Sequence, residues 1–424
     1  MEEKILTPPL YICAPFVILL LLIAVMPLVL PHFWEKNRNK AIIAAVISLP
    51  VLIFLLSNSP GELLHTLKEY ISFILLLASL FVISGGILIT GDLKATPIVN
   101  TMFLLAGAVI ANLIGTTGAS MLLIRPLLKT INERKHIIHI PVFFIFIVSN
   151  IGGSLTPLGD PPLFLGYLRG VPFTWTLRLL PIWVTAVAIL LGVFYIWDTY
   201  CYRKEKLTDV KRDISKVVPL KIMGCMNLLF LAGVILAVLF QTPAPYLELI
   251  MILMAVLSLI FTKKELRREN KFTFNPISEV AILFAGIFIT MVPLLLLLEQ
   301  KGAGLGITRP WQYFWFAGGL SSFLDNAPTY LTFTSLAESV TRSIGAGGFP
   351  VVHGIGVRED LLLAISCGAV FMGANTYIGN GPNFMVKSIA EEQKIKVPHF
   401  FGYMLYSGTI LLPLFALLTV IFFR

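Results

Sequence analysis

Long apolar runs recur along the whole of this chain, and they restrict the folds open to it. The runs cover Val17–Leu30, Ala41–Leu56, Ile71–Ile89, Ile182–Trp197, Ile222–Phe240, Leu247–Phe261 and Val280–Leu298. They approach or reach the roughly 20 residues that cross a hydrocarbon core. With 57% hydrophobic and 13% charged residues among 424, the chain has too little polar surface for a water-soluble globule. Because a spanning segment must satisfy its own backbone hydrogen bonds in lipid, the sequence predicts an all-α polytopic membrane protein.

The basic residues lie in short loops between these runs, where they report orientation. In a soluble protein a net charge of +9 would suggest nucleic acid, but here we expect no nucleic-acid partner. Placing six loop clusters on one side gathers 23 of the 32 Lys and Arg residues, namely those in 36–40, 94, 125–135, 203–221, 263–271 and 387–396. That side is predicted to be the cytoplasm. The four cysteines have no metal or disulfide spacing and are expected to act as small apolar residues.

Two twelve-residue segments that interrupt apolar spans are nearly the same. Gly153–Phe164 and Gly373–Phe384 align at a constant separation of 220 residues, with Gly, Thr, Gly, Pro and Phe in common. Asp160 of the first segment corresponds to Asn380 of the second. Duplicated, Gly/Pro-interrupted polar segments are typical of secondary transporters whose binding site lies between two repeats.

Two further segments break the alternation of spans. Segment 97–130 has basic clusters at both ends, so both ends belong inside and the segment is predicted to be a re-entrant hairpin. Segment 311–340 is interrupted at Asp325–Pro328 and has both flanks outside by the same rule. It should therefore enter from the opposite face. A weaker match at a separation of 211 residues relates Leu105–Leu113 to Phe316–Leu324.

These features predict about ten transmembrane helices plus two re-entrant hairpins, arranged as an inverted repeat. The expected units are N-terminal spans in 1–68, a first repeat in 69–200 with broken helix 140–166, a connector with two spans in 201–276, and a second repeat in 278–424 with broken helix 360–386. Irregular backbone at membrane depth is tolerated only where protein or water surrounds it. All four interruptions should therefore face one interior site. The two broken helices reach their breaks after about 18 and 20 Å of helix, which places each break near the membrane midplane.

Oxygen-bearing side chains cluster at the four interruptions. A helix broken in the membrane exposes carbonyl groups that can bind Na⁺ and N–H groups that favour an anion. The candidate ion- or substrate-binding residues are Ser149, Asn150, Ser154 and Thr156 at the first break, Asn375, Thr376, Asn380 and Asn383 at the second, and Asn112, Thr116, Thr117 and Asn326 at the hairpin tips. The alternative for each is an interhelical hydrogen bond that only serves packing.

Asp160 and Asp325 are the most specific candidates in the sequence. A carboxylate at the bilayer midplane usually carries ions or protons, so Na⁺ and H⁺ would compete for it. The alternative is that each aspartate only caps a helix. A tentative Na⁺ site combines both aspartates with Asn150 and Asn375.

Three other charged residues carry weaker signals. Glu69 and Glu279 lie at the starts of spans, where solvated charges are normal. Arg125 could contact a substrate carboxylate or could simply extend to the cytoplasmic interface.

The segment Ser149–Pro162, together with Asp325–Pro328 and Gly373–Pro382, resembles the ion transporter superfamily. The resemblance extends from about residue 65 to the end. The superfamily includes NhaD-type sodium/proton antiporters and citrate-transporter-like permeases, which this chain resembles. It implies inverted repeats, broken helices, and a homodimer that moves substrate by an elevator-like motion. Sodium/carboxylate members carry Ser-Asn-Thr at these positions, whereas here Asn150 is followed by Ile151. Only Ala374–Thr376 nearly keeps the pattern.

The primary hypothesis is a sodium/proton antiporter in which Asp160 and Asp325 carry the cations, with Na⁺ or H⁺ as coupling ions and no other cofactor. The alternatives are Na⁺- or H⁺-coupled transport of citrate or another small organic anion, and an arsenite-type permease. An enzyme is not expected, because no soluble catalytic domain, His/Glu metal motif or nucleophile elbow occurs. The first apolar run lacks the basic n-region of a signal peptide, and the compact loops fit a bacterial inner membrane.

Overall fold

The computed structural model describes residues 7–206, 213 and 217–424 and is almost entirely helical. Within these residues seven helices are long and apolar enough to cross a membrane, in segments Leu10–Pro27, Asn37–Asn58, Pro60–Ser84, Pro97–Thr130, Phe173–Tyr202, Asn275–Leu305 and Phe400–Phe422. Shorter apolar helices cover His139–Ser154, Met226–Leu239 and Tyr246–Phe261. The predicted all-α polytopic fold is confirmed.

One group of helices combines the start of the chain with its middle. It contains η1 (Leu10–Cys13), α1 (Ala14–Val29), α2 (Pro31–Trp34), α3 (Asn37–Asn58), α4 (Pro60–Ser84), α10 (Met226–Leu239), α11 (Tyr246–Phe261), α12 (Lys264–Glu269) and α13 (Asn275–Lys301). Helix α13 packs against α3 and α4, and α11 packs against α4. The Tyr70 hydroxyl donates to the carbonyl of Ala281 at 2.9 Å, and the Ser72 hydroxyl donates to Glu248. Polar bonds between apolar helices thus fix how they pack.

Two short strands join segments that the sequence assigned to helices and loops. Strand β1 (Leu88–Asp92) pairs antiparallel with β2 (Val218–Met223), with Leu88 opposite Met223. A second pair, β3 (Val351–Val352) with β4 (Val357–Arg358), forms a small hairpin. Pairing between β1 and β2 depends on a partner far away in the chain, so local periodicity does not reveal it.

Helix α5 (Pro97–Thr130) reverses direction in its middle. Gly115 has φ of +78°, which is a conformation that favours glycine. The backbone N–H of Leu93 donates to the Thr130 hydroxyl at 3.3 Å. A Cβ on Gly107 would lie 3.3 Å from the Leu123 side chain, although 16 residues of straight helix would separate them by about 24 Å. The two arms of α5 therefore lie antiparallel, as a hairpin requires.

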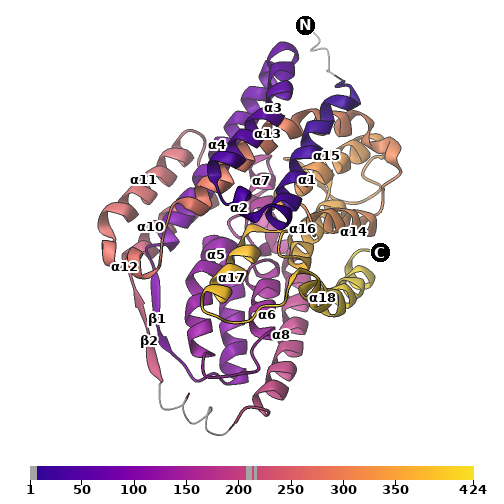
Figure 1. Ribbon diagram of the computed structural model, residues 1–424. Coiled ribbons are helices and arrows are strands. Elements are labelled where there is room, and N and C mark those ends of the chain that lie inside the picture. Colours follow the sequence, from indigo (N-terminus) through magenta and orange to yellow (C-terminus); the bar gives the residue numbers. More distant parts are fainter. Residues whose placement is uncertain (1–6, 207–212, 214–216) are drawn as a thin grey trace.

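The second hairpin consists of α14 (Pro310–Ser321) and α15 (Asn326–Ile344). The rings of Tyr313 and Phe333 lie 6.3 Å apart across it. The interruption falls at residues 322–325, slightly before the predicted Asp325–Pro328. Pro328 lies in the first turn of α15, where a missing N–H disrupts no helical hydrogen bond. In Figure 1, α5 lies in the lower half of the view, α15 in the upper half and α14 at mid-height on the right.

Two helices are broken at matching places. The first comprises α6 (His139–Ile147), η2 (Ile151–Ser154) and α7 (Pro161–Leu168), and the second comprises α16 (Glu359–Met372), η5 (Gly373–Asn375) and α17 (Gly381–Glu392). Asp160 and Asn380 precede α7 and α17 with φ and ψ of −145° and 143°, and −155° and 142°. The remaining elements are η3 (Phe173–Leu179), α8 (Leu180–Tyr202), η4 (Gly302–Leu305) and α18 (Phe400–Phe422).

Close backbone contacts confirm that the two breaks have the same local shape. A Cβ on Gly159 would lie 2.0 Å from the carbonyl oxygen of Gly153, and a Cβ on Gly379 would lie 2.6 Å from that of Gly373. Both glycine pairs obey the same separation of 220 residues. The spacing between the two glycines, which is the same in both copies of the segment, therefore reflects a turn that brings two stretches of backbone into contact. The boundaries of the two repeats, and their opposite orientation in a membrane, stay predictions.

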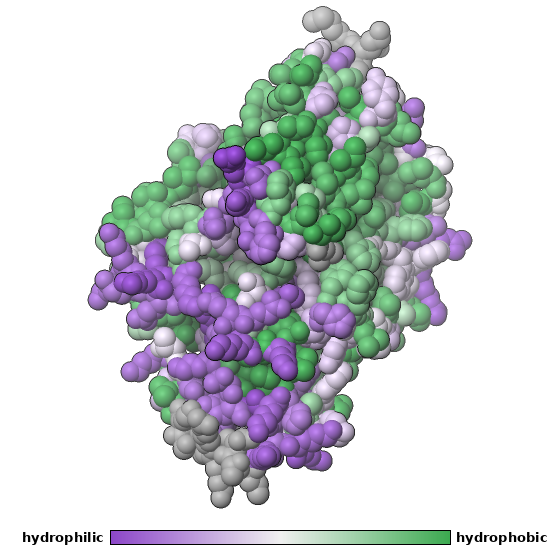
Figure 2. Space-filling model, viewed as in Figure 1, coloured by the Kyte–Doolittle hydropathy of each residue, from purple (hydrophilic) through white to green (hydrophobic). Residues whose placement is uncertain are grey.

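Hydrophilic residues are unevenly distributed over the face shown in Figure 2. They gather over the lower part of the view, around β1, β2 and α12, while apolar residues cover the upper helices α1 and α3. This polar end includes the predicted cytoplasmic cluster in 263–271. The uneven distribution supports a single membrane orientation.

Cysteine accessibility tests that orientation. In a variant without the native cysteines, we expect a membrane-impermeant maleimide to label Ser343→Cys on intact cells, because the end of α15 faces outside by the charge rule. Lys264→Cys on α12 should react only after the cells are permeabilised. Both positions are exposed. The reverse labelling pattern would overturn the predicted orientation.

A glycine substitution tests the backbone contact at the first break. Gly159→Ala places a methyl group against the carbonyl of Gly153, so we expect the protein to lose about 1–3 kcal/mol of stability. The control is Gly192→Ala on α8, where nothing lies within 4 Å and alanine favours the helix. The measurement is the apparent Tm in detergent. Equal Tm values for the two variants would contradict the observed turn.

Candidate functional site

The four interruptions of the fold meet in one region. Helix α5 contacts η2 and α17, α15 contacts α7, and α16 contacts η2. Each hairpin tip therefore lies against a helix break, as the sequence analysis expected. The buried side chains that the prediction named are brought together here from segments up to 233 residues apart.

Asp160 lies at the centre of this region. Its side chain is only 1% exposed. One carboxylate oxygen accepts a hydrogen bond from the Thr116 hydroxyl at 2.8 Å, and the other accepts from the amide of Asn326. A single carboxylate thus links the first break with both hairpin tips.

Asp325 has a partly structural role. It precedes α15, and its Oδ1 accepts the backbone N–H of Ala327 at 3.1 Å, which is an N-cap. The other carboxylate oxygen has no hydrogen bond within the described part of the chain. Asp160 and Asp325 lie close enough to repel each other electrostatically. A bound cation or proton would relieve this repulsion.

Three asparagines connect the two breaks directly. The amide nitrogen of Asn150 donates to Oδ1 of Asn383 at 2.7 Å and to the carbonyl of Ile145 at 2.8 Å. Oδ1 of Asn150 accepts from Asn380 at 3.2 Å. Asn383 in turn donates to the carbonyls of Gly373 and Thr376 at 2.8 and 2.9 Å. These bonds support the packing alternative for the three asparagines and weaken the case for Asn150 as a Na⁺ ligand.

Equivalent threonines attach each break to its own hairpin. The Thr156 hydroxyl donates to the carbonyl of Asn112 at 2.5 Å, and the Thr376 hydroxyl donates to the carbonyl of Ser322. The Asn112 side chain adds two bonds to the first break, from the N–H of Leu155 and to the carbonyl of Gly152, both at 2.7 Å. These contacts give unpaired backbone groups partners inside the membrane.

Two amide oxygens in the site lack partners. Oδ1 of Asn326 and Oδ1 of Asn375 are buried and have no hydrogen bond to any of the described residues. Their orientation is fixed, because the amide nitrogens donate to Asp160 and, at 2.9 Å, to Ser322. Leaving such an acceptor unpaired costs about 1–3 kcal/mol. Hard cations prefer oxygen ligands of this kind, so the unpaired oxygens point to a cation.

The remaining candidates also form hydrogen bonds, and several contributing residues were missed. Ser149 pairs with Ser120 at 2.8 Å, Ser154 donates to the carbonyl of Ile151 at 3.1 Å, and Thr329, which belongs to the same tip as Asp325, donates to its carbonyl at 2.9 Å. Thr117 is half-buried. Sequence reasoning did not single out Ser120, Ser321 or Ser322, although the weak match at Phe316–Leu324 contains the last two.

No basic side chain bonds to either aspartate in the described part of the chain. Arg125 lies 3.9 Å from Glu392 near the end of α17, and Lys271 pairs with the same glutamate. Arg125 is thus engaged away from Asp160. Helix α7 is also a poor anion site, because Pro161 and Pro162 lack N–H groups and the N–H of Leu163 bonds to the carbonyl of Asp160. The expectation that this helix start favours an anion is not met.

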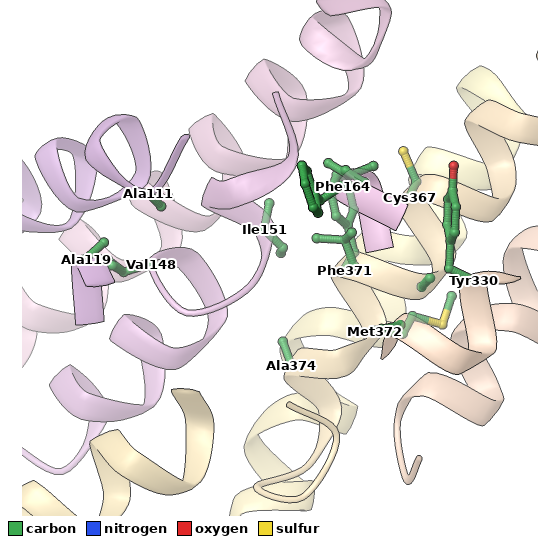
Figure 3. Close-up of a cluster of buried hydrophobic side chains, with 14 of the residues drawn as sticks. Ala111, Ala119, Val148, Ile151, Phe164, Tyr330, Cys367, Phe371, Met372 and Ala374 are labelled. Atoms are coloured by element: carbon green, nitrogen blue, oxygen red, sulfur yellow. The ribbon is translucent and has the colours of Figure 1, made fainter. Parts of the chain in front are cut away.

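Apolar side chains enclose the polar region. Figure 3 shows Phe164 of α7 beside Phe371 of α16, with Ile151 nearby. It also shows Ala119 of α5 next to Val148, at the end of α6. All five residues are fully buried. Small and aromatic residues therefore pack the broken segments tightly and fix the positions of the polar groups.

Comparison with known proteins adds a family to this geometry. Residues 6–423 match the model of a family described as "Putative citrate transport". A search of curated proteins gives no match. The match covers nearly the whole chain and confirms the resemblance to citrate-transporter-like permeases of the ion transporter superfamily. The chain therefore belongs to this citrate-transport family.

Proposed function

We propose that the protein is a secondary transporter that moves citrate or a related organic anion together with a cation, Na⁺ or H⁺. The family supports the anion. The observation that carries the cation is the pair of unpaired amide oxygens, on Asn326 and Asn375, in the region of the buried Asp160. Carboxylate and amide oxygens together suit a hard monovalent cation.

The cation would also help the anion to bind. Asp160 and Asp325 are acidic residues, and no Lys, Arg or His side chain among the described residues bonds to them. A citrate carboxylate placed here would be repelled unless a bound cation lay between the charges. Binding of the two substrates should therefore be cooperative, which is the basis of coupled transport.

Sodium/proton antiport, the first hypothesis from the sequence, remains the second candidate. The observation in its favour is that the candidate site contains two aspartates, to which no basic side chain of the described residues bonds. Such a site can bind Na⁺ and H⁺ in turn without an organic anion. The two candidates differ in whether ion flux requires citrate.

Flux measurements in liposomes distinguish the two functions. We expect the purified protein, reconstituted with an internal pH dye and given radiolabelled citrate, to take up citrate in the presence of a Na⁺ or H⁺ gradient. Without citrate, addition of NaCl should leave the internal pH unchanged. A sodium-driven pH change that needs no citrate would reject the proposed function and establish antiport.

Removing the charge of Asp160 tests the cation site. Asp160→Asn is isosteric and keeps an acceptor for the bonds from Thr116 or Asn326, so we expect the protein to fold. Cation-stimulated citrate uptake should fall at least about tenfold, the equivalent of about 1.4 kcal/mol. The control is Glu265→Gln, an exposed carboxylate on α12. Normal uptake by Asp160→Asn would remove this aspartate from the site.

Asp325 needs a test that separates capping from ion binding. Asparagine and serine are good N-cap residues, so Asp325→Asn and Asp325→Ser should preserve stability, whereas Asp325→Ala should cost about 1 kcal/mol. If Asp325 binds the cation, all three variants lose cation-stimulated uptake. Retention of uptake by the asparagine and serine variants would show that the residue only caps α15.

A further inference from the structure

A polar cavity lies outside the region of the four interruptions. It has a volume of about 570 Å³ and lies between α4, α13, α15, the end of α7 and the loop joining β3 to β4. We call it the acidic cavity, because its lining includes Glu62, Glu69, Glu299 and Glu338. By the charge rule it opens on the outer side of the membrane.

Negative charge in the acidic cavity is only partly compensated. Glu69, expected to be a solvated charge, is instead buried and pairs with Arg169 through two bonds of 3.1 and 3.3 Å. Glu338 pairs with Arg342 at 2.5 Å. Glu62 and Glu299 have no basic hydrogen-bond partner in the described residues, and Glu299 lies close enough to Glu338 for the two to repel. The lining also contains Arg169 and His65, but the four glutamates outnumber them. A cavity with an excess of one sign of charge concentrates counter-ions and disfavours ions of its own sign.

A buried hydroxyl provides an independent sign of a ligand. Ser335 lines the acidic cavity, is 1% exposed, and its Oγ has no hydrogen-bond partner among the residues that the structure describes. The neighbouring Thr334 hydroxyl, in contrast, donates to the carbonyl of Tyr330 at 2.7 Å. A buried hydroxyl normally has a partner, and its oxygen can accept a cation or a cation-bound water.

The ligand should be a hydrated monovalent cation. Among the described residues, no group of three or more His, Cys, Asp or Glu side chains is arranged to hold a metal ion. A dehydrated divalent ion needs such a set of ligands. A monovalent ion that keeps its water needs only the negative field and scattered oxygens.

Two helices connect the acidic cavity to the candidate site. Asp160 precedes α7, and Leu168 at its other end lines the cavity. Asn326 begins α15, and Thr334 two turns later lines the cavity as well. In each case the stretch of chain between the candidate site and the cavity is about 12 Å long at 1.5 Å of helix per residue. The helices pack closely, because a Cβ on Gly166 would lie 2.4 Å from the Tyr330 hydroxyl.

We infer that the acidic cavity is a cation vestibule, which gathers hydrated monovalent cations and supplies them along α7 and α15 to the site at Asp160. The inference rests on the proposed cation coupling and deepens it. The cavity repels carboxylates, so the organic anion does not occupy it. Loss of Glu299 and Glu338, two neighbouring carboxylates of the acidic cavity, should therefore weaken cation uptake at low concentration and leave the maximal rate unchanged.

Charge-selective thiol labelling tests the vestibule without relying on transport. Ile355→Cys, on the loop lining the cavity, is introduced into a variant without native cysteines. We expect a cationic methanethiosulfonate to react several-fold faster than an anionic one, relative to their rates with a small thiol in solution. Glu299→Gln/Glu338→Gln should abolish this preference, and the exposed control pair Glu265→Gln/Glu269→Gln should keep it. No preference in the parent variant would overturn the inference.

Transport then separates this inference from the proposed function. In liposomes, Glu299→Gln/Glu338→Gln should raise the half-saturating cation concentration about three- to tenfold, with the same maximal rate of citrate uptake as the Glu265→Gln/Glu269→Gln control. If the wild-type protein shows no cation dependence, the proposed function fails, whatever the labelling shows. If it shows cation dependence but the double variant matches the control, only the vestibule fails. Should the double variant not fold, Glu299→Gln alone gives the same comparison.

Discussion

The need to pair backbone polar groups inside the membrane determines the architecture of this protein. A helix broken at that depth leaves carbonyl and N–H groups that lipid cannot solvate. Here the breaks and the hairpin tips supply partners to each other. The Thr156 hydroxyl of the first break donates to the carbonyl of Asn112 in the hairpin, and the N–H of Thr116 at the hairpin tip donates to the carbonyl of Gly159 at 2.8 Å. The second break has the same arrangement with Thr376 and Ser322. Breaks and hairpins therefore stabilise each other, and the polar groups left over form the site.

Much of this fold could be predicted from the sequence because its signals are local. Apolar runs reveal spans, and Gly115 at positive φ marks the reversal of α5. The duplicated segment predicted two breaks of the same shape, and the matching turns at Gly159 and Gly379 agree. The short pairing of β1 with β2 could not be predicted, because neither strand indicates its distant partner.

The site was predicted less completely than the fold, for a physical reason. An asparagine in a broken span can tie segments together or bind an ion, and only three-dimensional contacts decide between these roles. Asn150 proves to use its whole amide in bonds to Ile145, Asn380 and Asn383, whereas Asn326 keeps a free oxygen. The partners are distant in sequence, so no local pattern could distinguish the two cases. Ser120 was missed for the same reason, since its partner Ser149 belongs to another element.

The two halves of the duplicated chain differ at the positions that carry charge. Asp160 in the first half corresponds to Asn380 in the second, and Asp325 corresponds to Ile114 at the weaker match. Each half thus contributes one acid, and each acid comes from a different element. Within the described residues the two acids lie in one candidate site, because Asn326, next to Asp325, bonds to Asp160. Under the proposed function this site must open to each side of the membrane in turn.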